Sequence, residues 1–394
     1  MMLSKSDWKP EIIATVVVVD LGTDYNVGTF LCTYTAYFMC SSMILVHFNS
    51  INGFIVYSSI YFLFCRFSVN MLPFLLLCFV ASVAQGQEEK PPYIEAEALR
   101  LFYAVSATYA PTSAKTKACF NRAGSDFSSN MRVFNFQCYW NVSLPGEPVG
   151  VDAAIAIVAY SSLRHEVLIS YKGTICPKNA NGTSDCPGVF HEFLDARLSK
   201  TYSYFKKQSM GSTLTYFRSC YESAMEEMGK YIQDLIHEKN DPRVSITGIS
   251  LGASLASITA AGLVLDEIVD GKRITMYSFG QPRTGGPDYA SKYDCTVPNS
   301  YRIVNHYDLI PLVPWIPNST TYYHHGTEIW YGDYMDSALT RDYSICAKKS
   351  DCSLGINFVA KYLTEEVNLL DHLTYFAYPQ TVDEFAKDSC SLPI

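Results

Sequence analysis

The chain lacks an excess of basic residues. Its 30 lysines and arginines are outnumbered by 38 aspartates and glutamates, which gives a formal net charge of −8 at pH 7. A chain of this charge has no electrostatic attraction to nucleic acid or to anionic lipid. We therefore expect no nucleic-acid partner.

Sequence signals for cofactors are also absent. The chain contains no glycine-rich phosphate-binding loop, no metal-ligand cluster and no internal repeat, and its cysteines show no C-x-x-C spacing. We expect no cofactor and no metal. The 308 residues after residue 86 (394 minus 86) suffice for one large domain with a full core.

The most informative segment runs from Val244 to Ala256 with the sequence VSITGISLGASLA. It predicts a β-branched strand, a G-x-S-x-G turn and a helix of small residues. Such a turn exposes its serine, here Ser250, while Gly248 and Gly252 remove side chains that would collide there. The N–H groups of the new helix are ready donors for an oxyanion. Ser250 is therefore a candidate nucleophile.

A serine nucleophile needs a histidine base that a carboxylate orients. Asp308 follows the apolar segment 301–305, so we expect it at the carboxyl end of a strand, where α/β folds keep their chemistry. The alternative is that Asp308 only forms a turn before Pro311. Spacing does not choose among the downstream histidines, which are His306, His324, His325 and His372.

Several blocks, in order, resemble the fungal-type class 3 triacylglycerol lipases of the α/β-hydrolase superfamily, over about residues 96 to 380. They are Lys172-Gly173-Thr174 (family RGT/S), Gly248-Ile249-Ser250-Leu251-Gly252 (GHSLG), 278–285 SFGQPRTG (TFGQPRVG), 301–311 YRIVNHYDLIP (RVVNxxDIVP), 324–330 HHGTEIW (HxGxExW) and 371–376 DHLTYF (DHxxYF).

The resemblance implies the role of each site residue. Ser250 is the nucleophile, Asp308 orients the base and His372 is the general acid/base. Thr174 and Leu251 supply the oxyanion N–H groups. The histidine of the HxGxExW block is not the base in the family, so the resemblance implies a structural hydrogen-bonding role for His324.

The pattern of apolar segments predicts an α/β fold with a mostly parallel central sheet covered by helices on both faces. Apolar residues from Phe217 to Leu235 recur at intervals of three and four, which predicts a helix. The expected strands are 153–160, 166–171, 244–247, 274–279, 301–305 and 328–331.

The N-terminal region predicts a secreted product. Residues 71–86 read as a signal peptide, with an apolar run from Leu72 to Val83 and the small-residue end Ala84-Gln85-Gly86. Residues 87–394 form the expected hydrolase domain. Residues 1–70 are an apolar extension that either spans a membrane or is no part of the mature product, and we favour the second interpretation. The alternative location is a membrane anchor formed by residues 12–84.

Cysteines and sequons fit a secretory compartment. Nine cysteines lie after residue 86, and an odd number leaves one free or paired with another chain. The resemblance implies Cys346–Cys352 in a short loop before the catalytic histidine. Loop closure favours Cys176–Cys186, and Cys119–Cys138 is a further candidate. The sequons are at Asn141, Asn181 and Asn318.

Residues 175–194 follow Thr174, where family members carry a mobile lid. Val189, Phe190, Phe193 and Leu194 could form its apolar face, which a lipid surface would bury. A closed loop fixed by Cys176–Cys186 is the alternative.

The expected function is therefore secreted hydrolysis of lipid esters, with a neutral acylglycerol as first choice of substrate. The alternatives are a secreted phospholipase or carboxylesterase, a membrane-anchored diacylglycerol lipase, and a non-catalytic lipid-binding relative.

Overall fold

The computed structural model describes residues 43–46, 60–63, 92–140, 150–174, 197–314, 321–335, 342–346, 352–354 and 370–391. Contacts divide the chain into two units, Met1–Lys90 and Pro91–Ile394. In the first unit, β1 (Met43–Val46) pairs antiparallel with β2 (Ile60–Leu63). The candidate catalytic residues all belong to the second unit.

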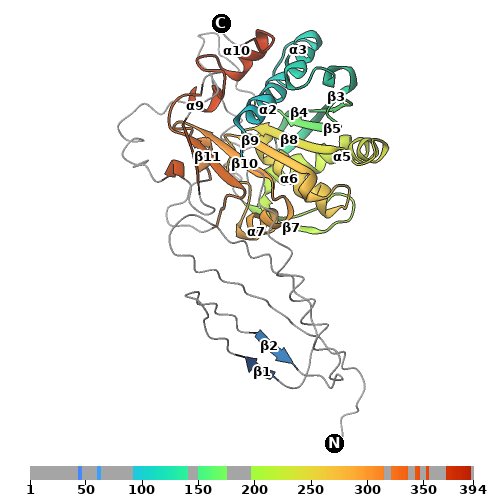
Figure 1. Cartoon of the computed structure of the whole chain (residues 1–394), viewed down its shortest axis with the longest axis vertical. Helices are drawn as coiled ribbons and strands as arrows, with labels where there is room; N and C mark the ends of the chain where they lie inside the picture. Colours follow the sequence, from blue (N-terminus) through green and yellow to red (C-terminus); the bar gives the residue numbers. More distant parts are fainter. Residues whose placement is uncertain are drawn as a thin grey trace, which may run out of the picture. The chain divides into compact units, whose positions relative to one another are not determined.

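Eight strands of the second unit form one sheet in the order β12-β11-β10-β9-β8-β5-β4-β3 (Figure 1). The pairs from β5 through β8, β9 and β10 to β11 are parallel, whereas β3–β4, β4–β5 and β11–β12 are antiparallel. The strands are β3 (Met131–Trp140), β4 (Gly150–Ser161), β5 (Glu166–Tyr171), β8 (Arg243–Ile249), β9 (Ile274–Phe279), β10 (Ser300–Asn305), β11 (Thr327–Tyr331) and β12 (Tyr343–Ile345).

The mostly parallel sheet confirms the predicted α/β class, and the six predicted strands correspond to β4, β5, β8, β9, β10 and β11. β4 and β5 are antiparallel because only residues 162–165 join them, too few for the crossover that parallel strands need. A separate hairpin is formed by β6 (Leu198–Tyr202) and β7 (Ser209–Leu214).

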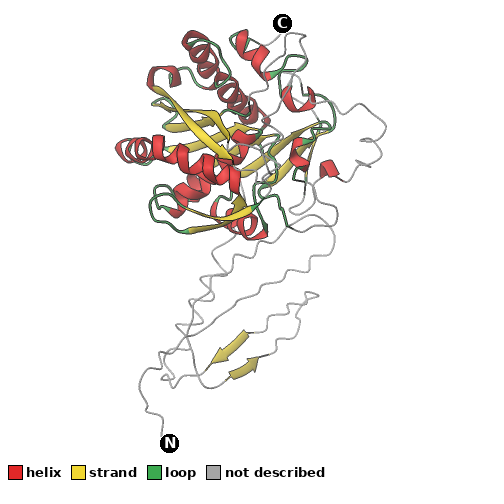
Figure 2. Cartoon of the chain, turned by 180° about the vertical axis from the view of Figure 1, so that it is seen from behind, coloured by secondary structure: helices red, strands yellow, loops and turns green. Residues whose placement is uncertain are grey.

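Helices cover both faces of the sheet and create two cores (Figure 2). On one face, α5, α6 and α7 pack against side chains such as Val158 and Ile246. On the other face, α2, α3 and α10 pack against side chains such as Leu168 and Phe279. The predicted apolar positions between Phe217 and Leu235 are all buried in α5. The helices are α2 (Glu95–Ala107), α3 (Ser113–Ala123), α5 (Thr215–Glu238), α6 (Leu251–Leu265), α7 (Pro287–Thr296), α9 (Leu370–Leu373) and α10 (Val382–Lys387).

The disulfides correct one predicted pairing. Cys119 bonds Cys390, and Cys138 bonds Cys220, so the predicted Cys119–Cys138 bond is wrong. The reason is that Cys138 faces α5 in the first core, whereas Cys119 lies in the second core on the opposite face of the sheet. The predicted Cys346–Cys352 bond is confirmed.

Cys295 is also disulfide-bonded. Cys176 and Cys186, for which a mutual bond was predicted, lie outside the described residues.

We expect Cys390→Ser to lower the free energy of unfolding by about 2–5 kcal/mol, because Cys119–Cys390 closes a loop across most of the domain and restricts the unfolded chain. Cys352→Ser opens a bond between residues only six apart, so its effect should be smaller. Denaturant unfolding of both variants measures the difference. Equal losses would show that the stabilisation does not follow loop length.

Candidate active site

Ser250 lies in the sharp turn between β8 and α6. Its backbone angles are φ 58° and ψ −128°, a conformation that residues with a Cβ rarely adopt. The Ser250 N–H donates to the Phe279 carbonyl at 2.9 Å, which fixes the turn against the end of the neighbouring strand β9. This is the strand–turn–helix geometry predicted for a nucleophilic serine.

The two glycines of the motif are required by close backbone contacts. A Cβ on Gly248 would lie 2.2 Å from the Gly252 carbonyl oxygen. A Cβ on Gly252 would lie 2.5 Å from the Lys172 carbonyl oxygen, at the end of β5. Any side chain at either position would therefore push α6 away from the sheet.

The segment Lys172-Gly173-Thr174 borders Ser250. β5 pairs with β8 so that Tyr171 is opposite Gly248, and a Cβ on Gly173 would lie 3.1 Å from the Ser250 Cβ. The Gly173 N–H donates to the Tyr109 hydroxyl at 3.0 Å, and the Lys172 Nζ lies 4.7 Å from the centre of the Tyr109 ring. The backbone that leads to Thr174 is thus held beside the serine.

Leu251, the other predicted oxyanion donor, is the first residue of α6. The first N–H groups of a helix have no acceptor within the helix, and the helix dipole favours negative charge there. Its position beside Ser250 therefore fits an oxyanion-binding N–H.

Asp308 and His372 form a buried pair. The His372 Nδ1 lies 2.8 Å from Asp308 Oδ2 and 3.0 Å from Oδ1. Asp308 is 3% exposed and His372 is 5% exposed. A carboxylate accepts hydrogen bonds only, so Nδ1 donates to Asp308 and Nε2 is the ring nitrogen left for base chemistry.

The Phe279–Gly280 peptide links this pair to the serine. The Phe279 carbonyl accepts from the Ser250 N–H, and a Cβ on Gly280 would lie 2.7 Å from His372 Nδ1 and 2.6 Å from Asp308 Oδ2. Gly280 has φ 56°, in the left-handed region. The Ser250 turn and the Asp308–His372 pair therefore both lie against the Phe279–Gly280 peptide at the carboxyl end of β9, the edge of the sheet at which α/β folds keep their chemistry.

Two further donors hold Asp308. The Ile310 N–H donates to Oδ1 at 2.9 Å, and the Tyr375 hydroxyl donates to Oδ2 at 2.5 Å. Burial, then the charge and the hydrogen bond of Asp308, raise the pKa of Tyr375 well above its ordinary value, so it stays a neutral donor. Sequence reasoning gave Tyr375 no role, although it stands three residues after His372 and could share its side of a helical turn.

We expect Tyr375→Phe to lower kcat roughly tenfold, because a hydrogen bond to the orienting carboxylate is lost. Tyr293→Phe is the matched control, since it removes a buried hydroxyl that bonds Ser300 at 3.1 Å rather than Asp308. Steady-state kinetics on a soluble ester compares the two. A control that loses as much activity as Tyr375→Phe contradicts the assignment.

The other downstream histidines are held elsewhere. His324 Nε2 bonds the Pro311 carbonyl at 2.6 Å, which fits the structural role predicted for it. His325 is fully buried against Gln281 at 3.0 Å. Burial, followed by the charge of Arg302, lowers the pKa of His325 well below its ordinary value, so this ring is neutral.

Comparisons with known proteins show what this chain is similar to. The sequence model of the class 3 lipases matches residues 179–318. A Caenorhabditis elegans lipase is 26% identical over 82% of this chain and 90% of its own length. Over residues 179–318 the chain carries the sequence pattern of the class 3 lipase family. It is a carboxylic ester hydrolase, and lipid esters are its substrate class.

Two further relatives refine the comparison. A secreted mono- and diacylglycerol lipase of Malassezia globosa is 32% identical over 34% of this chain, and the match spans 42% of that relative. The crystal structure of a Rhizopus microsporus var. chinensis lipase superimposes with a TM-score of 0.51 and 21% identity, over 74% of this chain and 93% of that one. This second likeness shows the α/β-hydrolase fold.

Some predicted features of the lipase lie outside the described residues. They are the signal peptide, the extension before it apart from β1 and β2, the lid residues Val189, Phe190, Phe193 and Leu194, and the sequons at Asn141, Asn181 and Asn318. Within the described ranges, no helix has the length and apolarity needed to cross a membrane.

Proposed function

We propose that this lipase is a secreted acylglycerol hydrolase that works through an acyl-enzyme on Ser250. The observation that carries the proposal is the buried Asp308–His372 pair at the same sheet edge as the strained Ser250 turn. The turn holds Ser250 in a largely buried position, 7% exposed, and the pair supplies a base whose orientation is fixed. A non-catalytic lipid-binding relative would have no need of this arrangement.

In the first half-reaction, the Ser250 Oγ attacks the ester carbonyl while His372 Nε2 takes its proton. The backbone N–H groups of Leu251 and Thr174 hold the negative oxygen of the tetrahedral intermediate. Asp308 stays ionised and stabilises the imidazolium through Nδ1. Collapse of the intermediate transfers the His372 proton to the leaving alcohol and leaves an acyl ester on Ser250.

In the second half-reaction, His372 takes a proton from water, which attacks the acyl ester. The same N–H groups hold the second oxyanion, and the fatty acid leaves as the proton returns to Ser250. No step requires a group beyond the residues named.

Two observations support the choice of substrate and location. The net charge of −8 gives no attraction to anionic headgroups, which favours neutral acylglycerols over charged phospholipids. The Malassezia relative is described as secreted and as acting on mono- and diacylglycerols. Residues 87–394 would then form the secreted enzyme, with a signal peptide at 71–86.

The test is a substrate panel for the form that begins at Gln87. It comprises emulsified triacylglycerol, diacylglycerol, phosphatidylcholine vesicles and a soluble short-chain ester, each with Ser250→Ala in parallel. We expect fatty acid from the acylglycerols and none from the mutant. Release from phosphatidylcholine alone supports a phospholipase, and hydrolysis of only the soluble ester supports a carboxylesterase.

Location and interfacial activation are tested separately. Enzyme recovered in the medium with an N-terminus near Gln87 supports secretion, and retention of residues 12–84 in membranes supports the anchored diacylglycerol lipase. If the segment carrying Phe190 and Phe193 acts as a lid, turnover rises when the ester passes from monomers to an emulsion. Equal turnover in both states would count against a lid.

A further inference from the structure

A second histidine–carboxylate contact lies next to the catalytic pair. Asp371 Oδ2 accepts from His306 Nδ1 at 3.0 Å and from the Tyr307 N–H at 3.2 Å. Asp371 is 4% exposed and directly precedes His372, while His306 stands two residues before Asp308. The two segments that carry the catalytic pair are therefore joined a second time.

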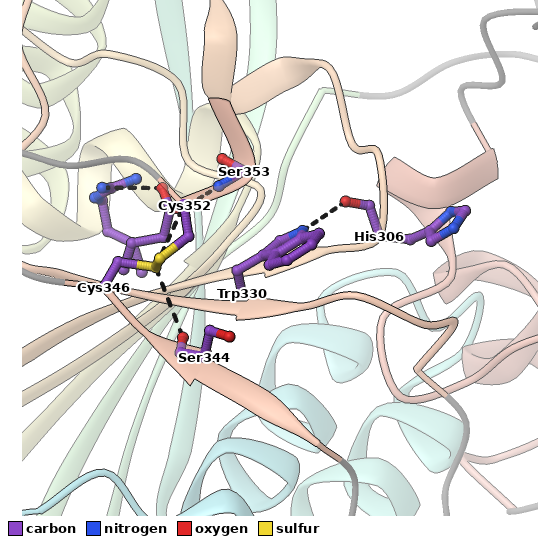
Figure 3. Close-up of a disulfide and its surroundings, with 8 residues drawn as sticks. His306, Trp330, Ser344, Cys346, Cys352 and Ser353 are labelled. Atoms are coloured by element: carbon purple, nitrogen blue, oxygen red, sulfur yellow. Dashed lines mark hydrogen bonds and ion pairs between the residues drawn. A yellow bond between two sulfur atoms is a disulfide. The ribbon is translucent and has the colours of Figure 1, made fainter. Parts of the chain in front are cut away.

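His306 is itself held in an unfavourable conformation. Its φ of 44° is in the left-handed region, which persists only where surrounding contacts enforce it. The His306 N–H donates to the Tyr331 carbonyl at 2.8 Å. The His306 carbonyl accepts from Trp330 Nε1 at 2.9 Å, and Figure 3 shows this indole between His306 and the Cys346–Cys352 disulfide. Strand β11 thus anchors the backbone of His306, while its side chain bonds Asp371.

The neighbouring Asn305 completes the connection. Its Nδ2 donates to the Asp371 carbonyl at 2.8 Å, and its Oδ1 accepts from the Met335 N–H at 3.2 Å. α9, which carries Asp371 and His372, has only four residues. A helix this short has little intrinsic stability, so these contacts fix its orientation.

We propose that His306 is a positioning residue for catalysis, which acts through Asp371 to hold the His372 ring at Asp308. The inference rests on the proposed function of His372 as the base. Loss of the His306 donor leaves the Asp371 carboxylate with the weaker Tyr307 N–H contact at 3.2 Å and so loosens the short helix. A small displacement of the base is enough to slow proton transfer, because catalytic groups act only within a narrow geometry.

Three substitutions separate the hydrogen bond from the backbone strain. His306→Asn keeps an N–H donor near the position of Nδ1 and tolerates the left-handed backbone. His306→Gly relieves the strain but removes the donor. His165→Gly is the matched control, because His165 is also a left-handed histidine, with φ 48°, and lies in the β4–β5 turn at the opposite end of the sheet.

The experiment measures kcat and KM of the form beginning at Gln87 on a soluble short-chain ester, with the melting temperature of each variant. Proton NMR follows the downfield signal of the His372 Nδ1–H that bonds Asp308. We expect His306→Gly to lower kcat roughly 10- to 100-fold with little change in KM, and to broaden or shift this signal. We expect His306→Asn to keep kcat within about threefold and His165→Gly to match the wild type.

A wild-type kcat for His306→Gly would overturn the proposal, as would equal losses for the Asn and Gly variants. If His306→Gly does not fold, Asp371→Ala decides instead, with the same expected loss of kcat. Ser250→Ala distinguishes failure of the His306 positioning role from failure of the proposed function. If it is inactive while His306→Gly is fully active, only the positioning role fails, whereas an active Ser250→Ala removes the proposed function itself.

Discussion

Replacing His372 with alanine is expected to lower kcat by roughly 10⁴-fold, the largest loss we predict among the histidines. Without the imidazole, no base takes the Ser250 proton and no acid protonates the leaving alcohol. The oxyanion N–H groups remain, so a small residual rate persists. Steady-state kinetics on a soluble ester measures the change, with kcat calculated per folded molecule.

The control for this prediction is His324→Ala. His324 bonds the Pro311 carbonyl and belongs to the block whose histidine the family does not use as a base, so its loss should reduce kcat by less than about tenfold. The reverse ranking of the two variants contradicts the choice of His372 as the base.

Gly280→Ala is expected to lower kcat roughly 100-fold without removing any catalytic atom. A Cβ at this position would lie 2.6 Å from Asp308 Oδ2 and 2.7 Å from both Cε1 and Nδ1 of His372. The φ of 56° adds backbone strain for any residue with a Cβ. The catalytic pair must therefore move apart or away from Ser250, which misplaces the base.

Gly326→Ala is the matched control for Gly280. Gly326 is also left-handed, with φ 71°, but a Cβ there would meet the Ser300 Oγ at 2.9 Å rather than the catalytic pair. Both variants should lose stability, but only Gly280→Ala should lose kcat per folded molecule. Thermal unfolding and kinetics on the same samples separate the effects, and equal kcat values for the two would contradict the role given to Gly280.

The strands and the turn at Ser250 could be predicted because their signals are local. Apolar runs such as 166–171 and 274–279 coincide with β5 and β9, and the glycines flanking Ser250 mark the turn. Asp308 followed from its place after an apolar run, since the carboxyl ends of parallel strands meet at one edge. The choice of His372 among four histidines needed the family resemblance.

The features that could not be predicted depend on which faces meet in three dimensions. Cys138 bonds Cys220 rather than Cys119, because Cys138 and Cys220 lie on one face of the sheet and Cys119 lies on the other. Likewise, Gly280 reads in the sequence as an ordinary turn glycine, and only the structure shows it against Asp308. The contact between His306 and Asp371 joins residues 65 positions apart, for which the sequence gives no spacing rule.

The most direct test of the account is covalent labelling of the enzyme with a p-nitrophenyl alkylphosphonate, followed by peptide mass spectrometry. We predict one p-nitrophenolate released per chain, a label on Ser250, and greatly slowed labelling in His372→Ala, because the phosphonate needs the same activated hydroxyl and oxyanion donors as an ester. Labelling of another residue, or undiminished labelling of Ser250→Ala, would contradict the claim that Ser250 is the nucleophile.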